Sequence, residues 1–434
     1  MTGAGLRQAE ILTVGNEIIS GFIQDTNARK LAARLNEIGV WVSRITAVGD
    51  DPAVIQAEVK AALDRAQVLI MTGGLGATHD DITKQVLADL FQSPLRVDAR
   101  VRDMILAFFR RRGKEASPLA LRQSEVPTAA TVLYNDAGTA PGLLFHRGDR
   151  RVYALPGVPA EMEHLLEKYL APGLAAMGDA KVLHRVLNTT GLAESALWEI
   201  TGPVDDLDLG VGVASLPSHL GVRIRLTVIG AAGSEGARRL DAAEARLREK
   251  LGRFIYSRDD ESLEQVVGRM LLQRGWTLAV AESCTGGLVS SRVTRVAGIS
   301  ASFLEGAVTY SNAAKIRRLG VNEDLLQTQG AVSEPVARAM AEGLRQGTGA
   351  DFTIAVTGIA GPDGGSAAKP VGLTFIAVTS PKGTQCASFQ LAQDRWRNQE
   401  RAAQAALNLL RLRILEMENG SVDRDSQGQG RLLK

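Results

Sequence analysis

The chain has 434 residues, more than one hydrophobic core usually organises, so its length predicts two or three domains. Apolar residues make up 45% of the chain and charged residues 23%, which is typical of globular proteins and excludes a wholly disordered chain. Fifty basic and 48 acidic side chains give a net charge of +2, which excludes a global electrostatic field for nucleic acid or an anionic membrane.

The sequence shows no membrane-spanning run and no secretory leader. No stretch approaches the roughly 20 apolar residues that cross a bilayer, and the N-terminus lacks a charged region followed by an apolar one. Cys284 and Cys386 are the only cysteines, too few for a disulfide framework or a cysteine-rich metal site. We therefore expect a cytoplasmic protein without a membrane partner.

The first part of the chain alternates short apolar runs with amphipathic stretches. This pattern predicts strand, helix, strand, helix, strand over residues 10–15, 26–38, 41–48, 52–66 and 68–73. The run 68–71 is apolar on both faces, as in parallel strands covered by helices, so we expect a doubly wound α/β domain. Loops 15–17, 73–76 and 156–159 each follow an apolar run and are expected to meet at the carboxyl edge of the sheet.

The middle of the chain has the pattern of a small α+β module. We expect strands over residues 182–190 and 222–229, and helices over 193–200 and 235–250. Residues 230–233 formally match the GXXG loop of nucleic-acid-binding KH domains, but they include no Lys or Arg to hold phosphates. We therefore do not expect a nucleic acid as a partner.

A second α/β region begins near Ser262. A helix is expected over residues 263–274, and apolar strands over 277–281, 352–356 and 371–378. Residues 417–434 are polar and without periodicity, so we expect a mobile tail with no assigned function.

The chemistry of this region has to proceed without histidine. All five histidines lie before residue 220, so it cannot contain a Ser-His-Asp site of its own. Lysine is the usual substitute base when burial lowers its pKa, and Lys315 is the candidate. Ser283 lies between a strand and a glycine turn, where N–H groups of the next helix could stabilise an oxyanion or hold a phosphate. The alternative is that Ser283 or Thr285 only caps that helix.

Five blocks in this region resemble the CinA family, whose C-terminal domain is a nicotinamide mononucleotide deamidase. The blocks are residues 281–287 (AESCTGG), 305–315 (EGAVTYSNAAK), 330–334 (GAVSE), 357–362 (TGIAGP) and 369–372 (KPVG). The resemblance implies that Ser283 is the nucleophile, supported by Lys315 and Tyr310, and that no cofactor is needed. Cys284 is the rival nucleophile. Implied substrate-binding residues are Thr285, Gly286, Gly287, Thr357, Gly358 and Gly361.

Residues 72–83 combine a glycine loop with two adjacent carboxylates, Asp80 and Asp81. Together with Glu17 and Asp25 they offer the hard oxygen ligands that suit Mg²⁺ beside a pyrophosphate. The alternative is that both aspartates cap a helix. His79 could act as acid or base, or be an ordinary polar loop residue.

This first domain resembles the molybdopterin-binding fold of molybdenum-cofactor proteins and, more closely, the CinA N-terminal domain, which is associated with ADP-ribose pyrophosphatase activity. The resemblance rests on residues 15–19 (GNEII), 25–27 (DTN), 138–142 (GTAPG) and 156–162 (PGVPAEM), while Ala77 stands where the family often has proline. It implies cleavage to AMP and ribose 5-phosphate with a divalent metal, Mg, Mn or Co, at Asp80 and Asp81, and K is a further candidate ion for this site. The implied site also includes Asn16, Glu17, Asp25, Asn27, Gly73, Gly74, Gly76, Pro156 and Gly157.

These expectations combine into a bifunctional pyridine-nucleotide salvage enzyme that acts on nicotinamide mononucleotide and ADP-ribose, with a homodimer implied by the family. The expected domains are 1–172, 173–258 (KH-like) and 259–416, followed by the tail 417–434. Two alternatives are a molybdopterin-handling transferase with an inactive C-terminal half, and a non-enzymatic competence or nucleic-acid accessory protein. The Ser283, Tyr310 and Lys315 set argues against the first, and the near-neutral charge argues against the second.

Overall fold

The computed structural model describes residues 7–175, 182–202, 210–230, 233–391 and 394–419. The chain divides into two compact units, residues 1–184 with 227–240, and residues 185–226 with 241–434. Among the helices of these described ranges, none is long and apolar enough to cross a membrane.

The N-terminal domain is built on a six-stranded sheet with the order β2-β1-β3-β8-β7-β6. Strands β2, β1, β3 and β8 run parallel, which confirms the doubly wound core, whereas β7 and β6 add an antiparallel edge that the sequence pattern did not predict. The strands are β1 (Arg7–Val14), β2 (Val40–Val48), β3 (Val68–Thr72), β6 (Thr131–Leu133), β7 (Gly142–Arg147) and β8 (Arg150–Leu155).

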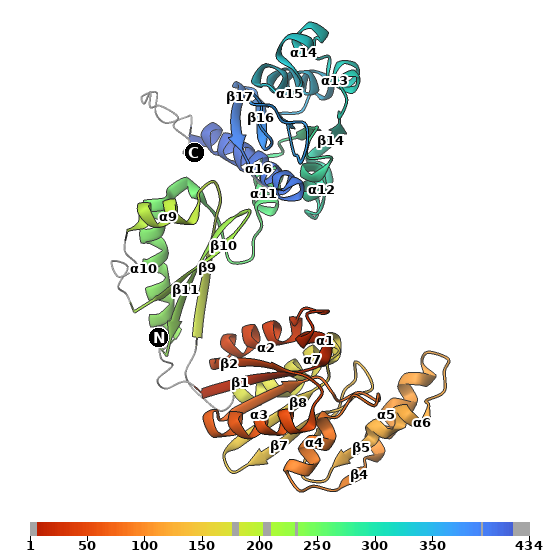
Figure 1. Ribbon diagram of the computed structural model, residues 1–434. Helices are drawn as coiled ribbons and strands as arrows, with labels where there is room; N and C mark the ends of the chain where they lie inside the picture. Colours follow the sequence, from red (N-terminus) through yellow and green to blue (C-terminus); the bar gives the residue numbers. More distant parts are fainter. Residues whose placement is uncertain (1–6, 176–181, 203–209, 231–232, 392–393, 420–434) are drawn as a thin grey trace. The chain divides into compact units, whose positions relative to one another are not determined.

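Helices cover both faces of this sheet (Figure 1). One core contains residues of α2 (Thr26–Glu37) and α7 (Pro159–Leu165), the latter continued by a π-helical turn (Leu166–Leu170) and α8 (Ala171–Ala175). The other core contains residues of α3 (Pro52–Arg65) and α4 (Thr83–Leu90). Buried apolar residues on both faces explain why the strands read as continuous apolar runs.

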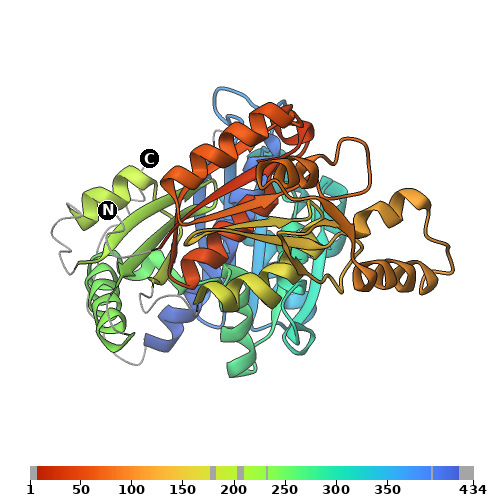
Figure 2. The same cartoon turned by 90° about the horizontal axis from the view of Figure 1, so that it is seen from below.

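An arm extends from the edge of this domain and stands clear of the sheet in both views (Figures 1 and 2). It consists of a two-stranded sheet and two helices, and the small apolar cluster around its helices also contacts Val132 of β6. Its elements are β4 (Leu95–Val97), α5 (Ala99–Arg110), α6 (Pro118–Leu121) and β5 (Glu125–Pro127).

The middle of the chain forms a four-stranded sheet with the order β10-β11-β9-β12. The expected strands and helices are present as β9 (Val182–Thr189), β11 (Gly221–Ile229), α9 (Glu194–Thr201) and α10 (Gly233–Leu251). Strands β10 (Gly212–Ser218) and β12 (Ile255–Arg258) were not predicted. The GXXG match at 230–233 includes residues 231 and 232, which lie outside the described residues.

The C-terminal domain has a five-stranded sheet with the order β14-β13-β15-β16-β17. Strand β13 lies between β14 and β15, parallel to both, and all five of its residues are buried. The strands are β13 (Leu278–Glu282), β14 (Phe303–Val308), β15 (Phe352–Gly358), β16 (Leu373–Ser380) and β17 (Gly383–Gln390). The carboxyl end of β13 therefore lies between those of β14 and β15.

Two groups of helices pack on opposite faces of this sheet and form separate cores. The first group is α11 (Leu263–Arg274), α12 (Leu288–Thr294) and α16 (Arg395–Asn419). The second group is α13 (Asn312–Leu319), α14 (Glu323–Gln329) and α15 (Glu334–Thr348). Helix α16 continues to Asn419, which corrects the expected start of the irregular tail at residue 417, and residues 420–434 lie outside the described residues.

Candidate active sites

Ser283 is the first residue after strand β13, at the carboxyl end of the sheet. Its backbone N–H donates to the carbonyl of Val356 at 3.0 Å, which extends the β13–β15 pairing by one residue and fixes the serine. The chain then turns through Gly286 and Gly287, whose φ angles of +62° and +98° favour glycine. Ser283 is 8% exposed, so its hydroxyl lies in a largely dry environment.

Lys315 approaches Ser283 from helix α13, whose first turn is capped by the side chain of Ser311. The Lys315 Nζ lies 3.1 Å from Ser283 Oγ and donates to the carbonyls of Thr309 at 2.7 Å and Tyr310 at 3.2 Å. The side chain is 1% exposed, and this burial lowers the pKa of Lys315. The structure thus brings the predicted nucleophile and the predicted base into contact.

The N–H groups at the start of helix α12 are engaged, which corrects the expectation that they point outward unpaired toward an oxyanion or a phosphate. The buried carboxylate of Glu282 accepts from the N–H of Gly287 and Val289, both at 3.0 Å, and from that of Ser290 at 2.9 Å. It also accepts from the Ser290 hydroxyl at 2.6 Å. Glu282 therefore caps helix α12, the role that sequence reasoning had left to Ser283 or Thr285.

The neighbours of Ser283 in the loop differ in their availability. Cys284 packs into the hydrophobic core, and burial raises the pKa of its thiol to about 12, so it is a neutral thiol at physiological pH. Thr285 is 4% exposed, and its Oγ1 has no hydrogen-bond partner among the described residues. Of these two side chains, Thr285 is the one left with an unused polar atom.

The Tyr310 hydroxyl is directed away from the base it was expected to assist. The carbonyl of Tyr310 contacts Lys315, while its hydroxyl accepts from Arg395 Nη2 at 3.1 Å and its side chain is 58% exposed. Any proton-transfer role of that hydroxyl stays a prediction.

The first turn of helix α16 holds two loops of this site, a feature that sequence reasoning missed. Arg395 Nη1 donates to the carbonyl of Gly361 at 2.7 Å, and Asn398 Nδ2 donates to that of Ala360 at 3.0 Å. Gln399 Nε2 donates to the carbonyl of Cys284 at 2.9 Å. The available signal was the run of polar residues at the start of an Ala- and Leu-rich helix. The groups that these residues contact lie far away in the sequence, so the run alone did not reveal them.

The predicted substrate loop after β15 is held by contacts of its own. Thr357 Oγ1 donates to the carbonyl of Ala331 at 2.8 Å, which joins the blocks TGIAGP and GAVSE. A Cβ on Gly358 would lie 2.7 Å from Thr374 Oγ1, so close packing against β16 already requires that glycine. Gly361 has a φ of +84°. Contacts of Thr357, Gly358 and Gly361 with a substrate stay a prediction.

In the N-terminal domain, the three expected loops meet at the carboxyl ends of β1, β3 and β8. The Gly73 N–H donates to the carbonyl of Leu155 at 3.1 Å, and a Cβ on Gly73 would lie 2.1 Å from the carbonyl oxygen of Val14. Asn27 Nδ2 donates to Gly157 O at 2.8 Å and to Thr72 Oγ1 at 3.1 Å. The loops are thus locked together by backbone contacts and one buried amide.

Several polar side chains lie near the point where these three loops meet. The Oδ1 of Asn27 is buried without a partner among the described residues. Asp25 caps α2 through Ala28 N and also accepts from Thr13 Oγ1 at 2.7 Å. Asn16 and Glu17 are exposed on α1 (Asn16–Ile19). The hydroxyl of Thr72 donates to the carbonyl of Pro156 at 3.0 Å.

The glycine loop after β3 folds back on itself. Gly74 O accepts from the N–H of Thr83 at 3.0 Å, and a Cβ on Gly76 would lie 2.4 Å from a carboxylate oxygen of Asp81. Asp81 accepts from the N–H and the hydroxyl of Thr78. A hydrogen bond from the Thr78 side chain lowers the pKa of the exposed Asp80.

The donor set expected for a divalent metal is incomplete in this arrangement. Within the described residues, no group of three or more His, Cys, Asp or Glu side chains could hold a metal ion. One of the two adjacent aspartates, Asp81, is already engaged in closing the loop. The residues present therefore do not by themselves form a metal site, and Asp80 and Asp81 as ligands stay a prediction.

Three family models match consecutive parts of the chain. The CinA C-terminal domain matches residues 260–414, a probable molybdopterin binding domain matches residues 10–176, and the KH domain of damage-inducible protein CinA matches residues 184–257. The "Putative competence-damage inducible protein" of Symbiobacterium thermophilum is 43% identical over 420 residues, covering 94% of this chain and 99% of that protein. The chain belongs to the CinA family.

Other CinA relatives agree with this assignment. The CinA-like protein of Chlorobaculum tepidum is 39% identical, covering 95% of this chain and 100% of that protein. Among solved structures, the protein CinA of Thermoplasma acidophilum, described as of unknown function, is 34% identical over 39% of this chain and 99% of that chain, with a TM-score of 0.36. The three family models match the molybdopterin-binding-like, KH and C-terminal domains that were expected from the sequence.

Proposed function

We propose that the C-terminal domain hydrolyses nicotinamide mononucleotide to nicotinate mononucleotide and ammonia, with Ser283 as nucleophile and Lys315 as base. The supporting observation is the set of contacts around the Lys315 amine. Two backbone carbonyls accept its N–H groups, and Ser283 Oγ is the third neighbour, at 3.1 Å. A neutral amine has two N–H donors and one lone pair, so this geometry directs the lone pair at the serine hydroxyl.

Burial supplies the protonation state that this role needs. Desolvation lowers the pKa of Lys315 and so favours the neutral amine, which can accept a proton. The Ser283 hydroxyl transfers its proton to Nζ as Oγ attacks the carboxamide carbon, forming a tetrahedral intermediate. The ammonium of Lys315 then protonates the departing nitrogen as the C–N bond breaks, and ammonia leaves behind a serine ester.

The second half of the reaction repeats these steps with water. Neutral Lys315 accepts a proton from the water that attacks the ester carbon, and it returns that proton to Ser283 Oγ when the ester bond breaks. The acid product and the free serine are regenerated with all atoms balanced. Thr285, with its buried and unused hydroxyl, is the side chain we assign to contact the substrate near Ser283.

Replacing the two candidate nucleophiles tests this proposal. Ser283→Ala is expected to lower ammonia release from nicotinamide mononucleotide by about a thousandfold or more, because the attacking atom is gone. Cys284→Ala is expected to keep most of the activity, because the Cys284 thiol is buried and neutral. The opposite pair of results would transfer the nucleophile to Cys284.

We further propose that the N-terminal domain cleaves ADP-ribose to AMP and ribose 5-phosphate with a divalent metal. The support is the family resemblance together with the meeting of the loops that carry Asn27, Gly73 and Gly157. The described carboxylates do not form a complete metal site, so no step is assigned to an ion. AMP release by the purified chain, and its loss in Asn27→Ala, is the corresponding test.

A further inference from the structure

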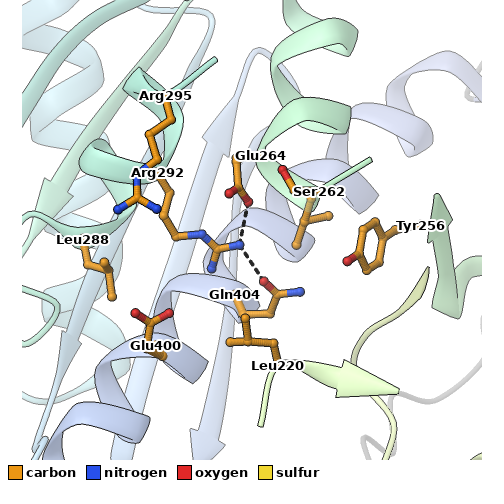
Figure 3. A pocket seen from close by; sticks show the side chains of 10 residues that line it. Leu220, Tyr256, Ser262, Glu264, Leu288, Arg292, Arg295, Glu400 and Gln404 are labelled. Carbon is orange, nitrogen blue, oxygen red and sulfur yellow. Dashed lines mark hydrogen bonds and ion pairs between the residues drawn. The ribbon is translucent and has the colours of Figure 1, made fainter. Parts of the chain in front are cut away.

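A pocket of about 200 Å³ lies in the second compact unit, and neither Ser283 nor Lys315 lines it (Figure 3). Its walls come from the turn before β11, from β12, and from helices α11, α12 and α16. The lining residues are Leu220, Tyr256, Ser262, Leu263, Glu264, Leu288, Arg292, Arg295, Glu400 and Gln404. A molecule of liquid water occupies about 30 Å³, so the pocket has room for a compact ligand and not for a dinucleotide.

Arg292 leaves one side of its guanidinium unused in this pocket. Its Nη2 donates to Glu264 Oε2 and to Gln404 Oε1, both at 2.7 Å, and Figure 3 shows the group held between these two side chains. The residue is 6% exposed, and its Nη1 is buried without a partner among the described residues. Because arginine stays charged when buried and unmade hydrogen bonds are costly, this nitrogen calls for an acceptor.

The other polar lining groups restrict the kind of acceptor. Glu264 already pairs with Arg292, and Arg295, three residues further along the chain, brings another cation to the lining. An anionic oxygen can therefore accept from Arg292 Nη1 and pair with Arg295. Glu400 and Ser262 also line the pocket, and they suit a ligand that carries hydroxyl groups. Leu220 and Leu288 supply apolar wall. The lining therefore matches a small molecule with an oxyanion at one end and hydroxyls on its body.

We propose that this pocket binds a compact hydroxylated oxyanion, a phosphate or carboxylate on a sugar-sized body. The site joins two parts of the same compact unit. Gln404 Nε2 donates to Thr190 Oγ1 at 3.3 Å, and Thr190 Oγ1 donates to the carbonyl of Leu220 at 3.2 Å. The adjacent His219 packs against Trp396 with 5.1 Å between ring centroids. The ligand would rest between the turn that holds Leu220 and helices α12 and α16.

Occupancy of this pocket is expected to change the rate of deamidation, a consequence that rests on the proposed function. Helix α12 begins just after the Ser283 loop, and the first turn of α16 holds Cys284, Ala360 and Gly361. Binding itself is measured by calorimetry and does not depend on any reaction, so the two proposals fail separately.

The experiment is calorimetric titration of the full chain with ribose 5-phosphate, with ribonate and with uncharged ribose. At least one of the two oxyanions is expected to bind and ribose is not, and the two oxyanions distinguish phosphate from carboxylate. Leu220→Trp fills the pocket while Arg292 itself is unchanged, and it is expected to weaken binding at least tenfold. Arg292→Lys keeps the positive charge but removes Nη1, the nitrogen proposed to contact the ligand. This variant is also expected to bind at least tenfold more weakly.

Leu216→Trp is the matched control, because Leu216 is 40% exposed on the preceding strand β10 and does not line the pocket. It should bind like the unaltered chain. The proposal is overturned if neither oxyanion binds, or if Leu220→Trp and Leu216→Trp bind them equally well.

Discussion

Glu282 has a structural role that the sequence pattern did not predict. It ends a buried strand as a charged side chain with no solvent exposure, and four donors from the α12 start satisfy it. Buried carboxylates are stable only when their hydrogen bonds are made, so the carboxylate and the turn hold each other in place. Ser283, the next residue, is positioned by that arrangement.

Glu282→Gln should therefore destabilise the C-terminal domain by about 2–4 kcal/mol, since an amide offers one acceptor oxygen and turns its NH₂ toward backbone donors. Denaturant unfolding measures this change. Ammonia release should fall as well, because the Ser283 loop loses its anchor.

Glu305→Gln provides a control at a carboxylate that contacts Arg318 on the surface of the same domain. Surface ion pairs contribute about 1 kcal/mol or less, so this change should have little effect on stability. Equal losses in the two variants would contradict the anchoring role of Glu282.

At the scale of elements, local pattern predicted only part of each large sheet. Apolar runs and helical periodicity located β1, β2, β3, β13, β15 and the helices α2, α3 and α11 within a few residues. Strand β14 was missed because its residues alternate between partly buried and exposed at the sheet edge. The hydrophobic period of a short segment can be determined from its sequence, but the position of the strand within its sheet cannot.

The first turn of α16 was missed for a different reason. Arg395 reaches Tyr310, which lies 85 residues earlier in the chain, so no local signal connects them. Ser283 and Lys315, by contrast, were paired through short motifs and the absence of histidine, and the structure places them in contact. The sequence predicted which residues carry the chemistry. It did not predict the side chains that position those residues, because they act through tertiary contacts.

Arg395→Ala tests whether the α16 turn positions the site. The exposed arginine bridges Tyr310 and Gly361, so its loss should lower kcat/KM for deamidation by about 10- to 100-fold through misplaced loops. The free energy of unfolding should change by no more than about 0.5 kcal/mol, as is usual for exposed residues.

Arg397→Ala is the comparison, because Arg397 is exposed on the same helix and pairs only with Asp394 among the contacts described. It should deamidate at the unaltered rate. Similar losses for Arg395→Ala and Arg397→Ala would show that the bridge to Tyr310 has no special role.

At the scale of the whole molecule, the two proposed reactions differ in what they require. The deamidase uses a serine and a lysine that the fold already brings together. The N-terminal loops meet as expected, but the sequence could not show that Asp81 is engaged in its own loop. The motifs indicated which residues lie near the proposed N-terminal site. They did not indicate which carboxylate oxygens are available to bind a metal.

A metal chelator should separate these reactions. Ammonia release from nicotinamide mononucleotide is expected to continue at an unchanged rate, because nucleophile and base are both side chains. AMP release from ADP-ribose is expected to fall. Both products can be measured in one reaction mixture, and a chelator-sensitive deamidation would contradict the proposed chemistry.

The lowered pKa of Lys315 also affects the stability of the fold. The folded pKa of Lys315 lies below its unfolded value, so the unfolded chain binds the proton more readily at pH values between the two. This lysine therefore costs stability as the pH falls below its ordinary pKa of about 10.4. Lys315→Met removes this titration, so its unfolding temperature should depend less on pH over that range than the unfolding temperature of the unaltered chain.

The most direct measurement is the rate of ammonia release from nicotinamide mononucleotide as a function of pH, for the unaltered chain and for Lys315→Met. For the unaltered chain, the rate should rise with pH through an apparent pKa below about 10.4, as the amine becomes neutral. The folded Lys315→Met chain should lose this activity by about a thousandfold. Full activity in that variant would contradict the role of Lys315 as the base.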